Sequence, residues 1–371
     1  MPDVVHICYP GIGGQAAVAT GLAVEAQRSG VPQGIIFYGV EPTAAQYVQL
    51  CDEQKIEHVS ILKKPGVGLG ARKLLRKAVV GMNPRIVISH HHDTSISLVG
   101  LGLSTIFVEH HSNALKTCKD WILSTLAHRL SDHTVYLTEA YRDEVIAKIG
   151  KWHAVEKSSI IANGLDLTLY QPIDSKNEDQ CIIGMQGRMD TGKDFETLLH
   201  AFAMLADRES SILELIGDGP KRTHLEQIAS ELGISKQVKF TGFLTQEKLI
   251  ERMRQWHLAV LMTMGETLSM AILEAWALQL PHISTRVPGV VDLVQHETDG
   301  FLVGATDKNA LADALKYLIK NPEKSQLLGL HGRRRVEQEF NLQTNYLSYL
   351  TLCNRILPLP IARQLQPEKT T

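Results

Sequence analysis

The feature that most constrains the fold is an alternation of strand and helix patterns that runs through the chain twice. A short apolar run at residues 4–10 precedes a glycine-rich loop at 11–14, and a stretch with apolar residues at helical spacing follows. Similar units recur up to about residue 170, and the alternation restarts with the apolar run 181–187. Such alternation is typical of parallel sheets covered by helices on both faces. We therefore predict an α/β chain with two doubly wound, Rossmann-like domains.

The predicted domains are an N-terminal, acceptor-binding one at 1–170 and a C-terminal, nucleotide-binding one at 171–345, with the tail 346–371 packing back on the first. The polar segment 174–180 is a candidate linker. In doubly wound sheets ligands bind beyond the carboxyl ends of the strands, so we expect a cleft between the domains. The further strands that we expect are at 34–40, 85–92, 104–111, 133–138, 160–161, 212–220 (ending in a glycine turn), 238–244, 258–263, 282–287 and 300–303.

Composition excludes several classes of protein. With 371 residues the chain exceeds one typical core, and its net charge of −2 does not suggest a nucleic-acid binder. The five cysteines are odd in number, far apart and free of CxxC, which argues against a disulfide framework or a zinc site and indicates a reducing compartment. No signal peptide and no apolar stretch long enough to span a bilayer is visible. We expect a cytoplasmic protein.

The first glycine loop leaves a dinucleotide interpretation open. Gly11, Gly13 and Ala16 fit a loose GxGxxG/A pattern, as in NAD(P)-dependent oxidoreductases. The acid near the expected distance is Glu41. The pattern is weak, and it leaves the second α/β half without a role. An oxidoreductase using the Gly11–Gly14 loop therefore remains the alternative.

Four charged residues in the second half suggest a binding site for a sugar and a diphosphate. Glu266 and Glu274 lie eight positions apart, and a helix from Leu268 onward would place both carboxylates along one side, about 12 Å apart. Arg188 and Lys193 follow the first strand of this half. Two cations at a strand exit can neutralise a diphosphate, arginine as a fork and lysine as a point charge.

These segments together resemble the retaining glycosyltransferases of the GT-B fold, family 4. The resemblance covers roughly residues 5–345, and its motifs occur in the family's order: GIGG (11–14), VEHHS (108–112), NGLDLTLYQP (163–172), GRMDTGKD (187–194), IGDGP (216–220), FTGFL (240–244), the E-x7-E pair and the EAWALQLP segment from 274. The chain departs from the family at Thr267, Leu268 and Ser269, where Phe-Gly is usual, and at Pro288, which precedes Gly289 where Gly-Gly is usual.

The resemblance implies transfer of a sugar from a nucleotide donor, UDP being the most frequent, with retention of anomeric configuration. Arg188 and Lys193 would stabilise the leaving diphosphate, helped by the backbone N–H groups of Gly13 and Gly14 and of the helix near Leu268 and Ser269. The leaving phosphate itself would take the acceptor's proton. No metal or other cofactor is implied, because the chain has no DxD and the histidine run 90–93 lacks the i, i+4 spacing of a helical zinc pair.

The resemblance also assigns roles around the donor. Glu274 would accept hydrogen bonds from the ribose hydroxyls, and Glu266 would orient the transferred sugar. His110 would lie near the reacting carbon, with His111 as the alternative. Leu244 would lie beside the nucleotide base, and residues 267–269 would shape the sugar pocket. A non-catalytic sugar-nucleotide-binding protein is a third possibility.

The acceptor side rests on a basic, amphipathic segment. Arg72, Lys73, Arg76 and Lys77 alternate with leucine and valine, a pattern that suits an anionic membrane surface. Family members often take lipid-linked acceptors. We therefore expect a peripheral enzyme at the inner face of the cytoplasmic membrane that extends a polyprenyl-diphosphate-linked oligosaccharide in O-antigen or capsule synthesis. A helix packed on the first sheet with a solvated charged face explains the pattern equally well.

Overall fold

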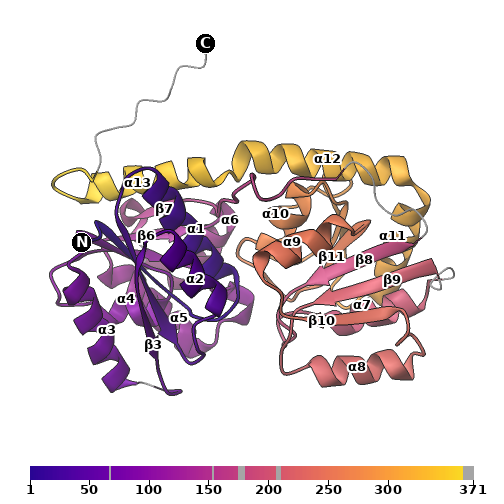
Figure 1. Cartoon of the computed structure of the whole chain (residues 1–371), viewed down its shortest axis with the longest axis horizontal. Helices are drawn as coiled ribbons and strands as arrows, with labels where there is room; N and C mark the ends of the chain where they lie inside the picture. Colours follow the sequence, from indigo (N-terminus) through magenta and orange to yellow (C-terminus); the bar gives the residue numbers. More distant parts are fainter. Residues whose placement is uncertain (67, 153, 174–179, 206–209, 362–371) are drawn as a thin grey trace, which may run out of the picture. The chain divides into compact units, whose positions relative to one another are not determined.

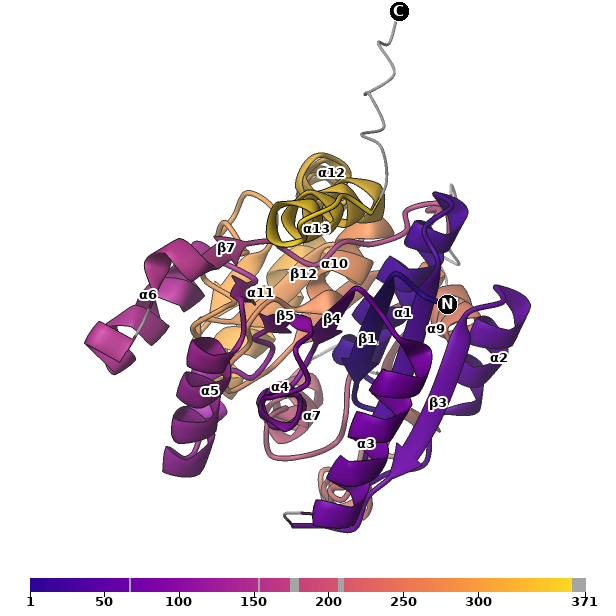
Figure 2. The same cartoon turned by 90° about the vertical axis from the view of Figure 1, so that its left-hand side faces the viewer.

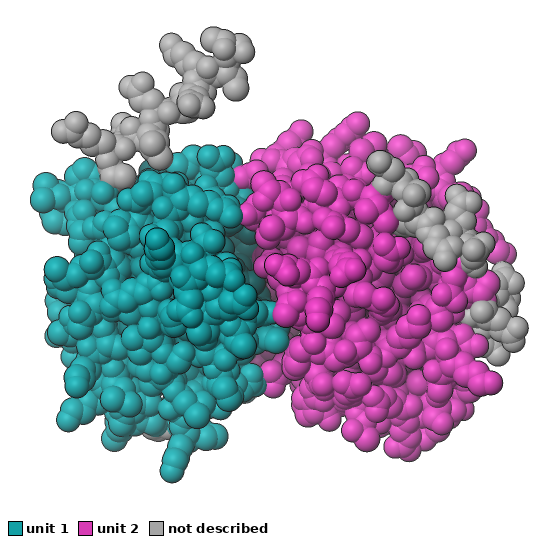
Figure 3. All heavy atoms as spheres, in the orientation of Figure 1, with its two compact units in different colours: residues 1–111, 116–164, 342–371 teal, residues 112–115, 165–341 magenta. Residues whose placement is uncertain are grey.

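The chain divides into two compact units (Figure 3). The computed structural model describes residues 1–66, 68–152, 154–173, 180–205 and 210–361. Unit 1 contains residues 1–111 and 116–164 together with the segment from 342 on, and unit 2 contains residues 112–115 and 165–341. The C-terminal segment therefore belongs with the N-terminal half of the chain. Of the expected linker, residues 174–179 lie outside the described residues.

Unit 1 is built on a seven-stranded parallel sheet of order β3-β2-β1-β4-β5-β6-β7. The chain moves outward from β1 to β3 and then returns to the other side of β1, which is the doubly wound topology. The strands are β1 (Val4–Cys8), β2 (Gln33–Gly39), β3 (Glu57–Leu62), β4 (Ile86–Ser89), β5 (Ser104–Val108), β6 (His133–Tyr136) and β7 (Ser158–Ile160).

Helices cover both faces of this sheet because successive strand residues point to opposite sides. Val5 and Ile7 of β1 pack with α3, whereas Cys8 packs with α1 and α2. Figure 2 shows α3 and α4 on one side of the sheet and α1 and α2 on the other. The helices of unit 1 are α1 (Gly14–Arg28), α2 (Ala45–Glu53), α3 (Leu69–Met82), α4 (His92–Ser97), α5 (Cys118–Leu130), α6 (Glu139–Ile149) and α13 (Leu342–Ile356), which packs on α1.

Unit 2 repeats the plan with a six-stranded parallel sheet of order β10-β9-β8-β11-β12-β13. Figure 1 shows α7 and α8 on one face of it and α9 and α10 on the other. Its strands are β8 (Cys181–Gln186), β9 (Ser211–Ile216), β10 (Val238–Gly242), β11 (Leu258–Leu261), β12 (His282–Thr285) and β13 (Phe301–Val303). Its helices are α7 (Phe195–Ala203), α8 (Arg222–Glu231), α9 (Gln246–Arg254), α10 (Met270–Ala277), α11 (Lys308–Lys320) and α12 (Pro322–Glu339).

The prediction of two doubly wound parallel sheets is confirmed, but one strand was missed. Strand β3 pairs along its whole length with β2, yet its sequence EHVSIL mixes polar and apolar residues. It lies at the edge of the sheet, where only Ile61 is buried among its residues. An edge strand needs fewer apolar residues than a central one, so it lacks the continuous apolar run by which the other strands were recognised. Among the described residues, no helix is long and apolar enough to cross a membrane.

Candidate functional site

The loop after β8 carries the two predicted cations of unit 2. It runs from Gly187 to Asp194, which caps α7 by accepting a hydrogen bond from the backbone of Thr197. The loop packs against the turn after β9 so closely that a Cβ atom at Gly219 would lie 2.4 Å from the carbonyl oxygen of Met189. Only glycine fits at this contact, so the close packing of the two loops explains the second glycine of the IGDGP turn.

Lys193 is paired with Glu266. The Lys193 ammonium donates to Oε1 of Glu266, and the two side chains are 21% and 16% exposed. The backbone around them is also fixed, since Lys193 forms a β-bridge with Thr263 and the Glu266 N–H donates to the carbonyl of Pro288 at 3.2 Å. The structure therefore brings together a predicted diphosphate ligand and the predicted sugar ligand.

Gly289 is the glycine that this chain keeps where the family usually has Gly-Gly. It has φ +79°, and a Cβ atom there would lie 2.0 Å from the carbonyl oxygen of Glu266. Its N–H donates to the Asp292 carboxylate at 3.1 Å. Glycine is required at this position for conformation and for space, and the turn holds the backbone of Glu266 in place.

Arg188, the other predicted cation, lies at the surface of unit 2. Its side chain is 45% exposed, and its Nε lies 3.7 Å from the Asp190 carboxylate. At that distance and exposure the attraction to Asp190 is weak. Part of the side chain is therefore in contact with solvent.

Glu274 lies in a separate hydrogen-bond network on α10. Tyr170 O–H donates to its Oε1 at 3.0 Å, and the Gln186 amide donates to its Oε2. Gln246 in turn donates to the Tyr170 hydroxyl at 3.3 Å. Burial raises the pKa of Glu274 to about 7, although the hydrogen bonds from Tyr170 and Gln186 act in the opposite direction.

Sequence reasoning missed Tyr170 and Gln186. Gln186 is the last residue of β8, and Tyr170 lies in the segment that links the two halves of the chain. A polar side chain at the carboxyl end of a buried parallel strand is a signal for Gln186, because ligands meet such sheets at that edge. No local pattern marks Tyr170, whose partner Glu274 is more than a hundred residues away.

The prediction that Glu266 and Glu274 lie along one side of a helix is wrong. Helix α10 begins at Met270 with Ser269 as its N-cap, so Glu266 lies in the preceding loop. The closely packed turn at Gly289 holds Glu266 in that loop. The two carboxylates therefore have separate partners, Lys193 for one and the Tyr170 network for the other.

The start of α10 offers backbone donors. Thr267, Leu268 and Ser269 are buried, and Ser269 makes no side-chain capping hydrogen bond. The first N–H groups of a helix lack partners within it, and together with the helix dipole they attract anions. Leu244, predicted beside the nucleotide base, is partly buried in the loop after β10.

In unit 1 the first glycine loop opens α1. Gly13 is the N-cap of this helix and Gly14 its first residue, without a capping side chain. A Cβ atom at Gly13 would meet nothing within 4 Å, so ligand atoms have room to approach the backbone there. A Cβ atom at Gly11, in contrast, would lie 2.4 Å from Oε2 of Glu41, the acid of the dinucleotide alternative.

His110 follows β5 in a loop that a buried ion pair holds in place. Lys116 donates to Glu109 at 2.9 Å, and the two side chains are 0% and 2% exposed. Glu109 also accepts from the backbone of His111, whose carbonyl accepts from Tyr141. The ring of His110 lies 2.9 Å from that of His90, and burial lowers the pKa of His110 to about 4, so its imidazole is neutral at pH 7.

The histidine run 90–93 is used in several ways. His91 accepts from the Asp93 N–H as the N-cap of α4, and His92 is buried. Asp93 pairs with Lys63 at 3.1 Å and with Arg72. The residues that the structure describes contain no group of three or more His, Cys, Asp or Glu side chains arranged to hold a metal ion.

Known proteins match both halves of the chain. The model of glycosyltransferase family 4 matches residues 12–169, and that of the glycosyl transferases group 1 matches residues 169–335. The N-acetyl-alpha-D-glucosaminyl L-malate synthase of Bacillus anthracis is 22% identical over 94% of this chain and 96% of its own length. The lipopolysaccharide core biosynthesis glycosyltransferase LpsD of Rhizobium meliloti is 30% identical, over 47% of this chain and 49% of its own length.

Solved structures show the same fold. Anabaena HepE in complex with UDP and glucose superimposes with a TM-score of 0.82 at 18% identity, over 95% of this chain and 99% of HepE. The two doubly wound sheets, the order of the motifs and both family models agree. The chain therefore belongs to the family 4 glycosyltransferases of the GT-B fold.

Proposed function

We propose that the protein is a retaining glycosyltransferase that takes a hexose or N-acetylhexosamine from a UDP-sugar without a metal ion. The observation that carries the proposal is the arrangement in unit 2: Lys193 rests on Glu266 just ahead of α10, and Glu274 lies on that helix among hydrogen-bond donors. Family membership leaves the oxidoreductase alternative without support. In HepE, whose fold this chain shares, UDP and glucose are the bound molecules.

The proposed chemistry places negative charge where unit 2 has cations and N–H donors. The bond between the anomeric carbon and the diphosphate oxygen breaks, a bond to the acceptor oxygen forms on the same face, and the acceptor's proton passes to the leaving phosphate. Lys193, Arg188 and the first N–H groups of α10 would stabilise the charge on the leaving group. Glu266 would orient the sugar, and Glu274 would hold the ribose diol.

Binding of UDP should raise the thermal stability of the protein. A ligand at 100 times its Kd adds about 2.7 kcal/mol to the free energy of unfolding, a readily measured shift in Tm. We expect a shift with UDP and UDP-sugars that is larger than with GDP, ADP or NADH, by differential scanning fluorimetry across this panel. A Tm that moves with NADH alone, or with no nucleotide, would contradict the proposal. Binding of UDP-sugars with neither hydrolysis nor transfer would instead identify a non-catalytic binding protein.

We further propose a lipid-diphosphate-linked saccharide as the acceptor, at the inner face of the cytoplasmic membrane, in synthesis of an O-antigen or capsule polysaccharide. One support is that LpsD, which matches 47% of this chain, is named as a glycosyltransferase of lipopolysaccharide core biosynthesis. Another is α3, where Lys73 and Lys77 are exposed beside exposed Leu69, Leu74 and Val80.

Two of the four predicted membrane cations have partners inside unit 1. Arg72 pairs with Asp93, and Arg76 donates to the carbonyls of Ser97 and Val99 at 2.9 and 2.8 Å. These contacts connect α3 to the segment around α4, so the arginines stabilise the unit itself. The proposed lipid contact therefore rests on Lys73 and Lys77 with the apolar residues between them.

The double change Lys73→Ser/Lys77→Ser should weaken binding to anionic vesicles. Each lysine near an anionic surface contributes about 1 kcal/mol, so the pair should cost roughly thirtyfold in affinity. The measurement is flotation with phosphatidylcholine vesicles with and without phosphatidylglycerol. Lys236→Ser/Lys239→Ser changes the charge equally at exposed positions of unit 2 and should leave binding unchanged.

Equal flotation of both double variants and the unmodified protein, or no preference for phosphatidylglycerol, would exclude the membrane proposal. A soluble acceptor would then be the better hypothesis. The B. anthracis relative, which matches nearly the whole chain, is named for a product of L-malate, so malate belongs in the acceptor panel from the start.

A further inference from the structure

Three histidine rings of unit 1, those of His6, His90 and His110, lie in succession within hydrogen-bond distance of one another. Nδ1 of His6 on β1 lies 3.1 Å from Nε2 of His90, and Nδ1 of His90 lies 2.9 Å from Nε2 of His110. The rings stack with centroids 5.4 and 5.2 Å apart. His6 is 2% exposed and His90 is fully buried, so water does not compete for the hydrogen bond between them, whereas His110 is partly exposed.

All three rings are neutral at physiological pH. Burial lowers the pKa of His6 and of His110 to about 4, and burial next to two other imidazoles lowers the pKa of His90 well below its ordinary value. In a neutral imidazole one nitrogen carries a proton and donates, and the other accepts. Each hydrogen bond in this series therefore sets the tautomer of the next ring, and the three tautomers are coupled.

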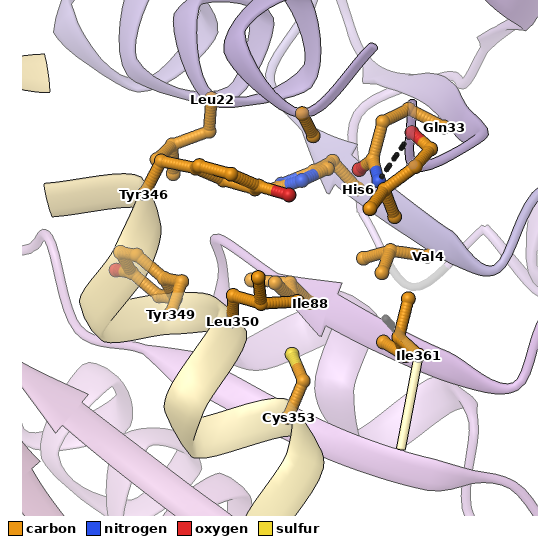
Figure 4. A pocket seen from close by; sticks show the side chains of 12 residues that line it. Val4, His6, Leu22, Gln33, Ile88, Tyr346, Tyr349, Leu350, Cys353 and Ile361 are labelled. Carbon is orange, nitrogen blue, oxygen red and sulfur yellow. Dashed lines mark hydrogen bonds between the residues drawn. The ribbon is translucent and has the colours of Figure 1, made fainter. Parts of the chain in front are cut away.

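Gln33 lies beside His6, at the opposite end of the series from His110, and determines in which direction the hydrogen bonds between the histidines run. Its NH₂ group donates to the backbone carbonyls of Val31 and Pro32, both at 3.3 Å. Its side chain also hydrogen-bonds His6, in the sense that favours a proton on that ring. With its NH₂ group used by the two carbonyls, Gln33 presents its carbonyl oxygen to His6. Figure 4 shows Gln33 and His6 lining a small pocket that Tyr346 and Tyr349 of α13 help to enclose.

The tautomers follow in order. Nδ1 of His6 faces His90, so Nε2–H of His6 donates to Gln33 and its Nδ1 accepts. Nε2–H of His90 then donates to His6, and Nδ1 of His90 accepts from Nε2–H of His110. We infer that Gln33, His6 and His90 hold His110 as its Nε2–H tautomer, with Nδ1 as a hydrogen-bond acceptor.

What the tautomer of His110 means for substrate binding rests on the proposed function. An acceptor nitrogen matches a hydroxyl group of a sugar substrate, which can donate a hydrogen bond. It does not match a phosphate, which at neutral pH needs a donor or a cation. Gln33, His6 and His90 are thereby positioning residues that select the kind of group His110 can bind.

The test is to read the tautomers directly by NMR. The chain has 16 histidines, so selective ¹⁵N-histidine labelling and long-range ¹H–¹⁵N correlation spectra of the ligand-free protein are suitable. The signals of His110 are identified by their loss in His110→Asn. We expect protonated Nε2 and unprotonated Nδ1 for His6, His90 and His110. A protonated Nδ1 on His110 would overturn the inference.

Two substitutions of Gln33 test what sets the direction. Gln33→Met has a similar shape but cannot accept, and we expect His110 to become a mixture of tautomers. Gln33→Glu still presents an acceptor to His6, and we expect the Nε2–H form to persist. If the spectrum of His110 is unchanged by Gln33→Met, Gln33 does not determine the tautomers of the three histidines.

The activity of two His90 variants is a second test of the inference. In His90→Asn the amide oxygen can still accept from Nε2–H of His110, whereas in His90→Val it cannot. We expect His90→Val to lower kcat about tenfold, the equivalent of one hydrogen bond, with the KM for UDP-sugar unchanged, and His90→Asn to stay within about threefold of the unmodified protein. Equal losses in both variants would refute the positioning role. The spectra do not depend on turnover, so an inactive protein with the expected tautomers would disprove only the proposed function.

Discussion

Changing Lys193 to alanine should lower kcat for sugar transfer by about 10²–10³-fold, the effect of removing one donor that stabilises charge in a transition state. In the ligand-free protein the Lys193 ammonium rests on Glu266. When a diphosphate leaves, the same ammonium would meet the developing charge, and Glu266 would turn to the sugar. Steady-state kinetics with UDP-sugar, combined with UDP affinity by calorimetry, separates the loss in kcat from the loss in binding.

The matched control for this change is Lys221→Ala. Lys221 pairs with Glu196 at 3.1 Å in the same unit, and these side chains are 34% and 38% exposed. Both this pair and the Lys193–Glu266 pair are partly exposed. Loss of either pair should therefore lower the free energy of unfolding by only about 1 kcal/mol or less. We therefore expect similar Tm values but very different kcat values. If Lys193→Ala keeps more than about a tenth of the activity, Lys193 does not have the role of an oxyanion donor.

Affinity for UDP-glucose should fall about tenfold for each pH unit below 7, because Glu274 would bind the ribose diol as a carboxylate. Burial raises the pKa of this group to about 7 in the ligand-free protein, so below that pH a proton must leave before the diol can donate to both oxygens. UDP-glucose is the better probe than UDP, since its diphosphate has no terminal group that titrates in this range. Calorimetry from pH 5 to 8 measures the effect.

Glu274→Gln is the control, since it removes the titration and keeps the shape. Its affinity should be lower than that of the unmodified protein at pH 8 and independent of pH. A pH profile that is the same in both proteins would show that Glu274 is not the titrating ligand. Tyr170→Phe, which removes one donor to Glu274, should move the midpoint of the unmodified profile upward.

The same pKa shift has a consequence for stability, with a defined sign. In the unfolded chain this carboxyl titrates near 4.5, and in the folded chain near 7, so the folded state holds the extra proton between these values. The free energy of unfolding therefore decreases as pH rises through this window, by at most about 3 kcal/mol for this group. Glu274→Gln should be more stable than the unmodified protein at pH 8 without ligand, as Tm measurements at pH 5 and 8 would show.

The strand and helix pattern was sufficient for the architecture, and the order of the motifs was sufficient for the family. Each central strand buries both faces, so its apolar run is visible in the sequence without knowledge of its neighbours. The predictions failed where the structure of a segment depends on contacts with residues that are distant in the sequence. Strand β3 is recognised as a strand only through its pairing with β2, and Arg72 and Arg76 appeared available to a membrane until Asp93 and the carbonyls of Ser97 and Val99 were placed beside them.

The Glu266–Glu274 pair shows the same limit within the site. Their spacing of eight residues identified the family motif, but it predicted the wrong geometry, because Glu266 precedes α10 and is held by the turn at Gly289. Its partner is Lys193, and the partners of Glu274 are Tyr170 and Gln186. These contacts join positions 73, 104 and 88 residues apart in the sequence.

The sequence by itself therefore determined the two α/β domains, the family and the identity of the charged residues at the strand exits. Those features depend on local periodicity and on short motifs, which a chain carries whatever its partners are. Only the tertiary structure decided which carboxylate has a cation and which has a raised pKa, and that His6, His90 and His110 form one chain of hydrogen bonds. Burial and hydrogen-bond partners depend on distances between residues far apart in the sequence, and those distances exist only in the folded chain.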